Sequence, residues 1–190
     1  MKISTKSDRS DYPSAARIKW FRQQLSTWGV ANRRDFQWRK TTDSYHLLVA
    51  ESLLQKTDAQ TVAPIYELFL EHYPTIKDLA AANLDNVAQL LKPLGLFFRA
   101  VRLQQCAQII ISQYEGKVPQ TQKHLLELPG IGDYTARAIG SQAFNQPLAV
   151  LDANVARILE RFFGLQGERV KSRCKILWGA ADLIAPKTKV

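Results

Sequence analysis

The chain has 190 residues, of which 46% are hydrophobic, and a formal net charge of +9, so it can bury a core and favours an anionic partner such as nucleic acid. Two cysteines, Cys106 and Cys174, exclude a disulfide framework and indicate a reducing compartment inside the cell, the cytoplasm or the nucleus. No apolar run approaches the roughly 20 residues of a membrane span, which argues against membrane association.

Apolar residues recur at intervals of three and four, and this pattern predicts a chain that is nearly all helix. Residues 1–13 are polar and charged, lack the apolar core of a signal peptide and are interpreted as a flexible tail. Ser14 then caps a first helix, which we expect to end at Gly29. Four apolar residues share one face of this helix: Ile18, Phe21, Leu25 and Trp28. A basic, aromatic connector follows over residues 32–40.

The second helix, from about Asp43 to Gln55, is apolar nearly all round and should therefore be central. Asp58 caps the third helix. Further helices are expected over residues 75–82, 85–91, 119–128, 133–144, 153–163 and 171–185. A long helix between the second and third of these carries Val101 to Tyr114 and is expected to close at Gly116. No segment has a convincing strand pattern, so the predicted fold class is all-α.

The segment Leu128–Ala136 places two glycines around one apolar residue, between two of the predicted helices. A tight Gly130-Ile131-Gly132 turn would leave backbone N–H groups free at the start of the second helix. Such a helix N-terminus is an anion site, and in a basic protein the anion expected is a nucleic-acid phosphate. The competing interpretation is a plain turn between packed helices.

Four segments together resemble the helix-hairpin-helix (HhH-GPD) DNA glycosylase superfamily, in the branch of endonuclease III, adenine DNA glycosylase and thymine–guanine mismatch glycosylase. The hairpin segment Leu128–Ala136 is the first, and Ala149–Arg157 resembles the catalytic aspartate segment. Phe36–Arg39 and Ala50–Thr57 resemble the entry and glutamate motifs. The resemblance runs from about Ile18 to Ile184 and implies a DNA glycosylase of base-excision repair.

By this resemblance the fold has two helical lobes. Residues 14–40 and 145–190 would form one lobe, and residues 41–144, with the hairpin at 119–144, would form the other. The chain stops at Val190 without the four-cysteine loop of many relatives, so we expect a C-terminally shortened form with no iron–sulfur cluster. The His and Cys residues show no metal-ligand spacing. A monovalent cation held by the hairpin carbonyls is the cofactor that the resemblance still allows.

The resemblance assigns Asp152 as the carboxylate that stabilises the positive charge on the sugar and activates water. Asp152 also stands where an N-cap belongs, and the two roles are compatible. Glu51 interrupts an apolar helix and would protonate the departing base. Endonuclease III-type enzymes have a lysine at the position of Tyr134, and tyrosine forms no Schiff base. A monofunctional glycosylase without strand cleavage is therefore expected.

The expected DNA contacts fall at the hairpin, at the end of the second helix and in the basic connector. They are Leu128, Gly130, Ile131, Gly132, Thr135, Gln55, Lys56, Arg39 and Trp38, with Trp38 as a stacking ring. The expected partner is double-stranded DNA, bound by a monomer.

The target base stays open at this point. Asp152-Ala153-Asn154 is closer to thymine–guanine mismatch glycosylases. Phe97-Phe98-Arg99 replaces the Tyr-Tyr pair typical of adenine glycosylases, which weakens the adenine interpretation without removing it. Glu51 also fits enzymes that remove adenine opposite guanine or 8-oxoguanine. The alternative from another class is a truncated, noncatalytic helix-hairpin-helix protein that only binds DNA.

Overall fold

A computed structural model describes residues 12–95 and 97–186, and within them the chain forms helices and connecting loops without a strand. The predicted tail at residues 1–13 falls almost entirely outside the described residues. The chain divides into two compact units. The middle unit comprises Asp35–Gln146, and the terminal unit combines the chain up to Arg34 with the residues from Pro147 onward.

Helix α2 (Ser44–Leu53) is the centre of the middle unit. Eight of its residues are buried, as its continuous apolar sequence predicts, and Asp43 caps it by accepting hydrogen bonds from the N–H groups of Tyr45 and His46. Two of the buried residues of this helix, Glu51 and Ser52, are polar. The Ser52 hydroxyl donates to the Leu48 carbonyl at 2.7 Å, so its polar group is paired within the helix. Glu51 is the one residue of this helix with a carboxyl group.

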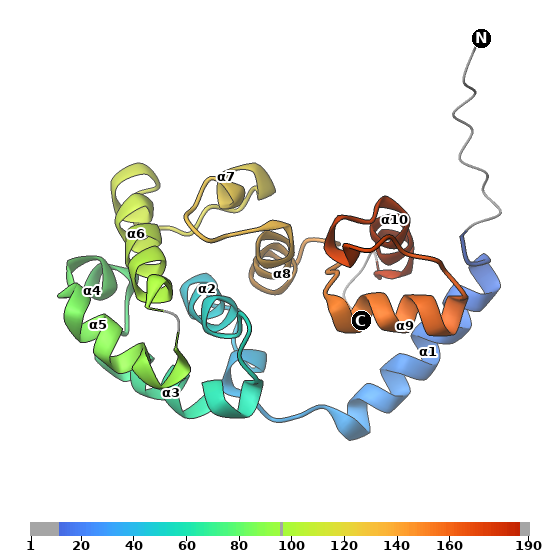
Figure 1. Cartoon of the computed structure of the whole chain (residues 1–190), viewed down its shortest axis with the longest axis horizontal. Helices are drawn as coiled ribbons and strands as arrows, with labels where there is room; N and C mark the ends of the chain where they lie inside the picture. The colour runs from blue at the N-terminus through green and yellow to red at the C-terminus, as the bar shows by residue number, and fades with distance from the viewer. Residues whose placement is uncertain (1–11, 96, 187–190) are drawn as a thin grey trace, which may run out of the picture. The chain divides into compact units, whose positions relative to one another are not determined.

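Helices α3, α6 and α8 pack directly against α2, while α4 and α5 cover α6 and α7 packs on α8 (Figure 1). The bounds are α3 Ala59–His72, α4 Ile76–Ala81, α5 Leu84–Leu91, α6 Phe98–Gln113, α7 Gln122–Leu126 and α8 Asp133–Phe144. Short 3₁₀ turns, η2 (Gln37–Arg39) and η3 (Lys92–Leu94), lie in the connections. Side-chain caps at Asp58, Thr75, Asn83 and Thr121 begin four of the helices, because each accepts the otherwise unpaired N–H groups of the first turn.

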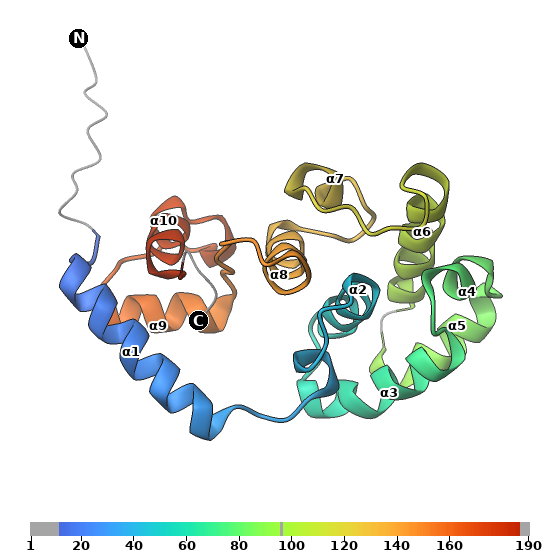
Figure 2. The ribbon, with the colours of Figure 1, turned by 180° about the vertical axis from the view of Figure 1, so that it is seen from behind.

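The terminal unit is built from α1 (Ala15–Asn32), α9 (Ala153–Phe163), the turn η4 (Lys171–Arg173) and α10 (Lys175–Ile184), which Figure 2 shows from behind. Its core is a cluster that α9, α10 and the segment before α9 supply. The Phe21 ring of α1 lies 5.1 Å from that of Phe163. Arg22 donates to the carbonyls of Leu183, Ile184 and Ala185, which caps the C-terminal end of α10.

The end of α1 differs from the prediction. Ser14 caps the helix as expected, but the helix runs through Gly29 to Asn32, since the Arg33 N–H still bonds the Gly29 carbonyl at 2.9 Å. A glycine inside a helix costs only about 1 kcal/mol and does not by itself end it. The predicted apolar face is also wrong in its second half, because Leu25 and Trp28 are 50% and 61% exposed.

None of the described helices is both long enough and apolar enough to cross a membrane.

Candidate functional site

The turn between α7 and α8 has the geometry that its two glycines suggest. Gly130 has a φ of 80°, which is left-handed, and a Cβ built on it would lie 3.0 Å from Cδ of Arg102. Gly132 is the N-cap of α8 and offers no side chain to the N–H groups of the first turn. Leu128, Ile131 and Thr135 are buried. Gly130 and Gly132 are exposed, so the two glycines, and not these three predicted contact residues, lie at the surface of the turn.

Three carbonyls of this turn are tied to neighbouring donors. Leu128 accepts from the N–H of Ile131 at 3.2 Å, Pro129 accepts from Sγ of Cys106 at 3.0 Å, and Gly130 accepts from Nε2 of Gln55 at 3.1 Å. Burial raises the pKa of the Cys106 thiol to about 12, so Cys106 stays protonated and keeps its donor. The role of Cys106 in fixing the hairpin was not apparent from the sequence. A cation at these carbonyls stays a prediction.

A second turn lies beside the hairpin, where α2 ends and α3 has not yet begun. Its residues are Gln55, Lys56 and Thr57, and Lys56 has a left-handed backbone with a φ of 57°. Arg99 of α6 is only 3% exposed and donates to this turn. Through the bond from Gln55 to Gly130 this turn lies next to the hairpin, and DNA contact by Gln55 and Lys56 stays a prediction.

Glu51 is buried on α2 at 8% exposure. Nε2 of Gln142, on α8, donates to Oε1 of Glu51 at 3.3 Å. The two residues are 91 positions apart, so only the packing of α2 against α8 reveals this contact. Burial disfavours the charged form of a carboxyl group, and the amide of Gln142 gives this one a fixed orientation.

Asp152 is the N-cap of α9, as predicted. Its Oδ1 accepts from the Val155 N–H at 2.7 Å and its Oδ2 from Nδ2 of Asn154 at 3.0 Å. Each carboxylate oxygen therefore has a donor from the first turn of α9, and the residue is half-buried. The N-terminus of α9, with its partial positive charge, therefore lies directly beside this carboxylate.

The predicted catalytic residues divide between the two units. Glu51 and Tyr134 belong to the middle unit, where Tyr134 follows the N-cap of α8 by two residues and is 36% exposed. Asp152 belongs to the terminal unit, where Val155 and Asn154 of α9 are its hydrogen-bond donors.

The structure corrects one of the predicted DNA contacts. The Trp38 ring is 6% exposed, stacks on Phe36 at 4.7 Å and meets Tyr66 edge to face at 5.3 Å. It is a core residue of the middle unit, and it is not presented for stacking on a base. The periodicity of a short connector did not reveal this burial. Arg39 lies over the Phe36 ring at 5.6 Å and is only half-buried.

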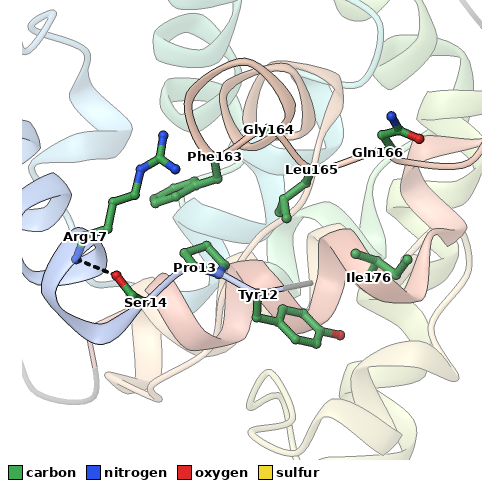
Figure 3. A pocket seen from close by; sticks show the side chains of 9 residues that line it. All are labelled: Tyr12, Pro13, Ser14, Arg17, Phe163, Gly164, Leu165, Gln166 and Ile176. Carbon is green, nitrogen blue, oxygen red and sulfur yellow. Dashed lines mark hydrogen bonds between the residues drawn. The ribbon is translucent and has the colours of Figure 1, made fainter. Parts of the chain in front are cut away.

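A cavity of about 740 Å³ opens in the terminal unit, and its described lining contains no predicted site residue (Figure 3). Arg17 is the one charged side chain in that lining. Its guanidinium donates to the Phe162 carbonyl and lies over the Phe162 and Phe163 rings at 5.2 and 5.5 Å. The charge is therefore engaged by α9, and the cavity is not assigned a ligand.

The described part of the chain contains no cluster of three or more His, Cys, Asp or Glu residues that could hold a metal ion. Cys106 and Cys174 are both buried, and two cysteines are fewer than the ligands that a four-cysteine iron–sulfur centre needs.

Comparison with known proteins gives a consistent result. Residues 49–180 match the family model described as HhH-GPD superfamily base excision DNA repair protein. The chain is 37% identical over 172 residues to the thymine/uracil-DNA glycosylase of Methanothermobacter thermautotrophicus, covering 90% of this chain and 78% of the relative. It is 36% identical over 181 residues to the adenine DNA glycosylase of Homo sapiens, covering 90% of this chain and 33% of the relative. A solved thermostable thymine-DNA glycosylase superposes with a TM-score of 0.85 at 36% identity, covering 90% of this chain and 80% of that one.

Proposed function

The chain belongs to the HhH-GPD superfamily of base excision DNA repair proteins and is a DNA glycosylase, and we propose that it is a monofunctional enzyme that hydrolyses the glycosidic bond of thymine or uracil opposite guanine. The single observation that carries the mechanism is the Asp152 carboxylate, fixed at the start of α9 by two donors.

Breaking the bond between C1′ of the sugar and the base leaves positive charge on the sugar, while the base takes the electron pair. Asp152 stabilises this oxocarbenium-like state and accepts the proton of the water that adds to C1′. A carboxylate that is already oriented needs no reorganisation as the charge develops, and this is the main source of electrostatic catalysis.

Glu51 is proposed as the acid that gives a proton to the departing base. Its position on buried α2 supports this role, because burial and the contact with Gln142 hold the carboxyl group in one place. The hydrogen bond from Gln142 then serves to orient Glu51.

Tyr134 supports hydrolysis without strand cleavage. A strand-cleaving lyase needs an amine that forms a Schiff base with C1′, and a phenol has none. The expected product is therefore an intact strand with an abasic site.

DNA binding is proposed to centre on the hairpin and the turn beside it. The N–H groups at the start of α8 suit a backbone phosphate, with Gly130 and Gly132 allowing its close approach. Gln55 and the exposed Lys56 lie at the adjoining turn, where a side chain can enter the space that a flipped base leaves.

Similarity favours thymine or uracil over adenine as the target. The thymine/uracil relative matches 90% of this chain at 37% identity, and the solved thymine-DNA glycosylase superposes on it with a TM-score of 0.85. Asp152-Ala153-Asn154 and Phe97-Phe98-Arg99 favour the same choice.

The test is base release from end-labelled duplexes that carry one mismatch: T opposite G, U opposite G, A opposite G or A opposite 8-oxoguanine. Each duplex is analysed with and without hot alkali. Breakage after alkali at T and U alone is the expected result. Release of adenine alone would contradict the proposed base, and breakage without alkali would contradict the monofunctional assignment. Binding without release on all four would favour the noncatalytic DNA-binding module.

Asp152→Asn tests the mechanism directly. The amide oxygen keeps the cap hydrogen bond from Val155 but the charge is gone, so base release should fall by about a thousandfold or more while the dissociation constant for duplex DNA changes little. Asp43→Asn is the matched control, because Asp43 caps α2 in the same way without a proposed catalytic role. Wild-type release rates in Asp152→Asn would remove Asp152 from the mechanism.

A further inference from the structure

Arg99 is the most unusual buried residue of the middle unit. Its side chain is 3% exposed, and burial lowers its pKa although the guanidinium remains charged. Its acceptors are neutral: Nη1 donates to the Leu53 carbonyl at 3.0 Å, and Nη2 donates to the Gln55 carbonyl at 2.6 Å and to Oγ1 of Thr57 at 3.1 Å. Nε is buried without a hydrogen-bond partner among the described residues.

The acceptors lie at the end of α2 and in the turn after it, and two of them, on Leu53 and Gln55, are backbone carbonyls that have lost their helical partners. One guanidinium therefore replaces the hydrogen bonds that the next turn of helix would have supplied. It also bonds the residues directly before and after Lys56, which are Gln55 and Thr57.

Lys56 adopts a left-handed backbone, which strains an L-residue other than glycine. Nothing in the local sequence selects this conformation, since neither Gly nor Asn stands there. The bonds from Arg99 to Gln55 and Thr57 fix the chain before and after Lys56, and thereby hold the strained residue in place.

The same end of α6 also contacts the hairpin. Arg102 lies one turn after Arg99, and its side chain packs over Gly130, where a Cβ would come within 3.0 Å of its Cδ. Its guanidinium lies 4.7 Å from the centre of the Phe98 ring. Gln55 joins the two turns through its bond to the Gly130 carbonyl. The start of α6 thus fixes both turns that face DNA in the proposed function.

We propose that Arg99 is a positioning residue for base extrusion: its buried guanidinium holds the Gln55–Thr57 turn in the strained form that directs Gln55 and Lys56 into the duplex. This inference rests on the proposed function, since it concerns the step before the glycosidic bond breaks. Arg99 itself touches neither the base nor the sugar.

The chemistry of the site explains why arginine is needed. The planar guanidinium reaches three acceptors from one position, whereas a lysine ammonium in the same place cannot reproduce the fork. Arg99→Lys therefore keeps the positive charge but loses the planar fork of donors, and the proposal depends on that fork.

The experiment compares single-turnover base release from two duplexes at saturating enzyme. In one, T is opposite G. In the other, T is opposite a tetrahydrofuran abasic analogue, so the target has no paired base to leave. Arg99→Lys should slow release about tenfold on the paired target, the factor that a lost hydrogen bond to a charged group is worth, and less than about twofold on the unpaired target.

Arg22→Lys is the matched control. Arg22 also donates to three backbone acceptors at the end of a helix, but it belongs to the terminal unit and bonds neither turn. It should lower the thermal midpoint as Arg99→Lys does and leave the ratio of the two release rates unchanged. An equal loss on both duplexes in Arg99→Lys would overturn the proposal, because it would show a purely structural role.

Thr57→Val provides a second variant if Arg99→Lys does not fold. It removes one acceptor of Arg99 with little change of shape, and the ratio of paired to unpaired release should still fall about threefold. An unchanged ratio in folded Thr57→Val would overturn the proposal.

Fluorescence of 2-aminopurine beside the mismatched T measures unstacking without chemistry. It should rise with the unaltered protein and rise less with Arg99→Lys. If the unaltered protein releases no base, the proposed function fails, while this fluorescence comparison still decides the role of Arg99.

Discussion

At the scale of single residues, function depends on side chains that the surrounding structure has already oriented. Asp152 has donors on both oxygens, and Glu51 is buried with an amide donor. Tyr134 differs, because its ring is partly exposed and its proposed importance is that a phenol, unlike an amine, forms no Schiff base with the sugar. That difference can be tested by supplying the amine.

Tyr134→Lys should introduce strand cleavage, because an amine at the start of α8 can attack C1′ once the base has gone. Borohydride should then trap a covalent protein–DNA adduct on the mismatched duplex. The double variant with Asp152→Asn is the control and should give no adduct, since no abasic site forms. Failure of Tyr134→Lys to form an adduct on a duplex with a preformed abasic site would show that this position does not reach the sugar.

At the scale of the element, the hairpin depends on one glycine more than on the other. Gly130 needs its left-handed backbone, and a methyl group placed on it would lie 3.0 Å from Arg102. Gly132 has an extended backbone, and a methyl group there would meet no atom of the described residues within 4 Å. The two glycines look equivalent in the sequence. Only the conformation of the turn separates them.

Gly130→Ala should therefore destabilise the fold by about 1–2 kcal/mol through backbone strain alone, and should weaken DNA binding by displacing the turn. Gly132→Ala is the comparison and should change stability by less than about 0.5 kcal/mol. Denaturant unfolding of the two variants measures both effects on stability. Equal losses would contradict the importance given to the left-handed conformation.

At the scale of the whole molecule, the positive charge is concentrated in one part of the chain. Residues 1–34 and 147–190 carry 16 of the 26 basic and 6 of the 17 acidic residues, a net charge of +10, while residues 35–146 have a net charge of −1. The hairpin therefore lies in the unit with almost no net charge. Long-range attraction of DNA must come mainly from the terminal unit.

Salt dependence tests this division. Replacing the exposed residues Arg169, Arg173 and Lys175 by Ala should reduce the slope of log affinity against log salt, by about 0.9 for each phosphate that the protein no longer neutralises. Replacing Lys77, Lys92 and Lys117 of the middle unit should change the slope less, although the same charge is removed. Equal changes would show that net charge alone, and not its location, governs binding.

The sequence by itself determined the parts of this protein that depend on neighbours along the chain. Ser14, Asp58 and Asp152 cap helices as predicted, and α8 and α9 have their expected bounds, because caps and periodicity act within one or two turns. The order of four motifs also sufficed to indicate the family.

Tertiary structure decided what depends on residues far apart in the sequence. It buried Trp38 and left Trp28 exposed. It also placed Gln142 against Glu51, and Arg99 where its guanidinium donates to the Leu53 carbonyl at the end of α2. Burial and long-range hydrogen bonds depend on which helix faces pack together. Amphipathic periodicity predicts which face of a helix is apolar, but not which other helix packs against it. The candidate acid could therefore be predicted from the sequence, but the residues that hold it and the DNA-facing turns could not.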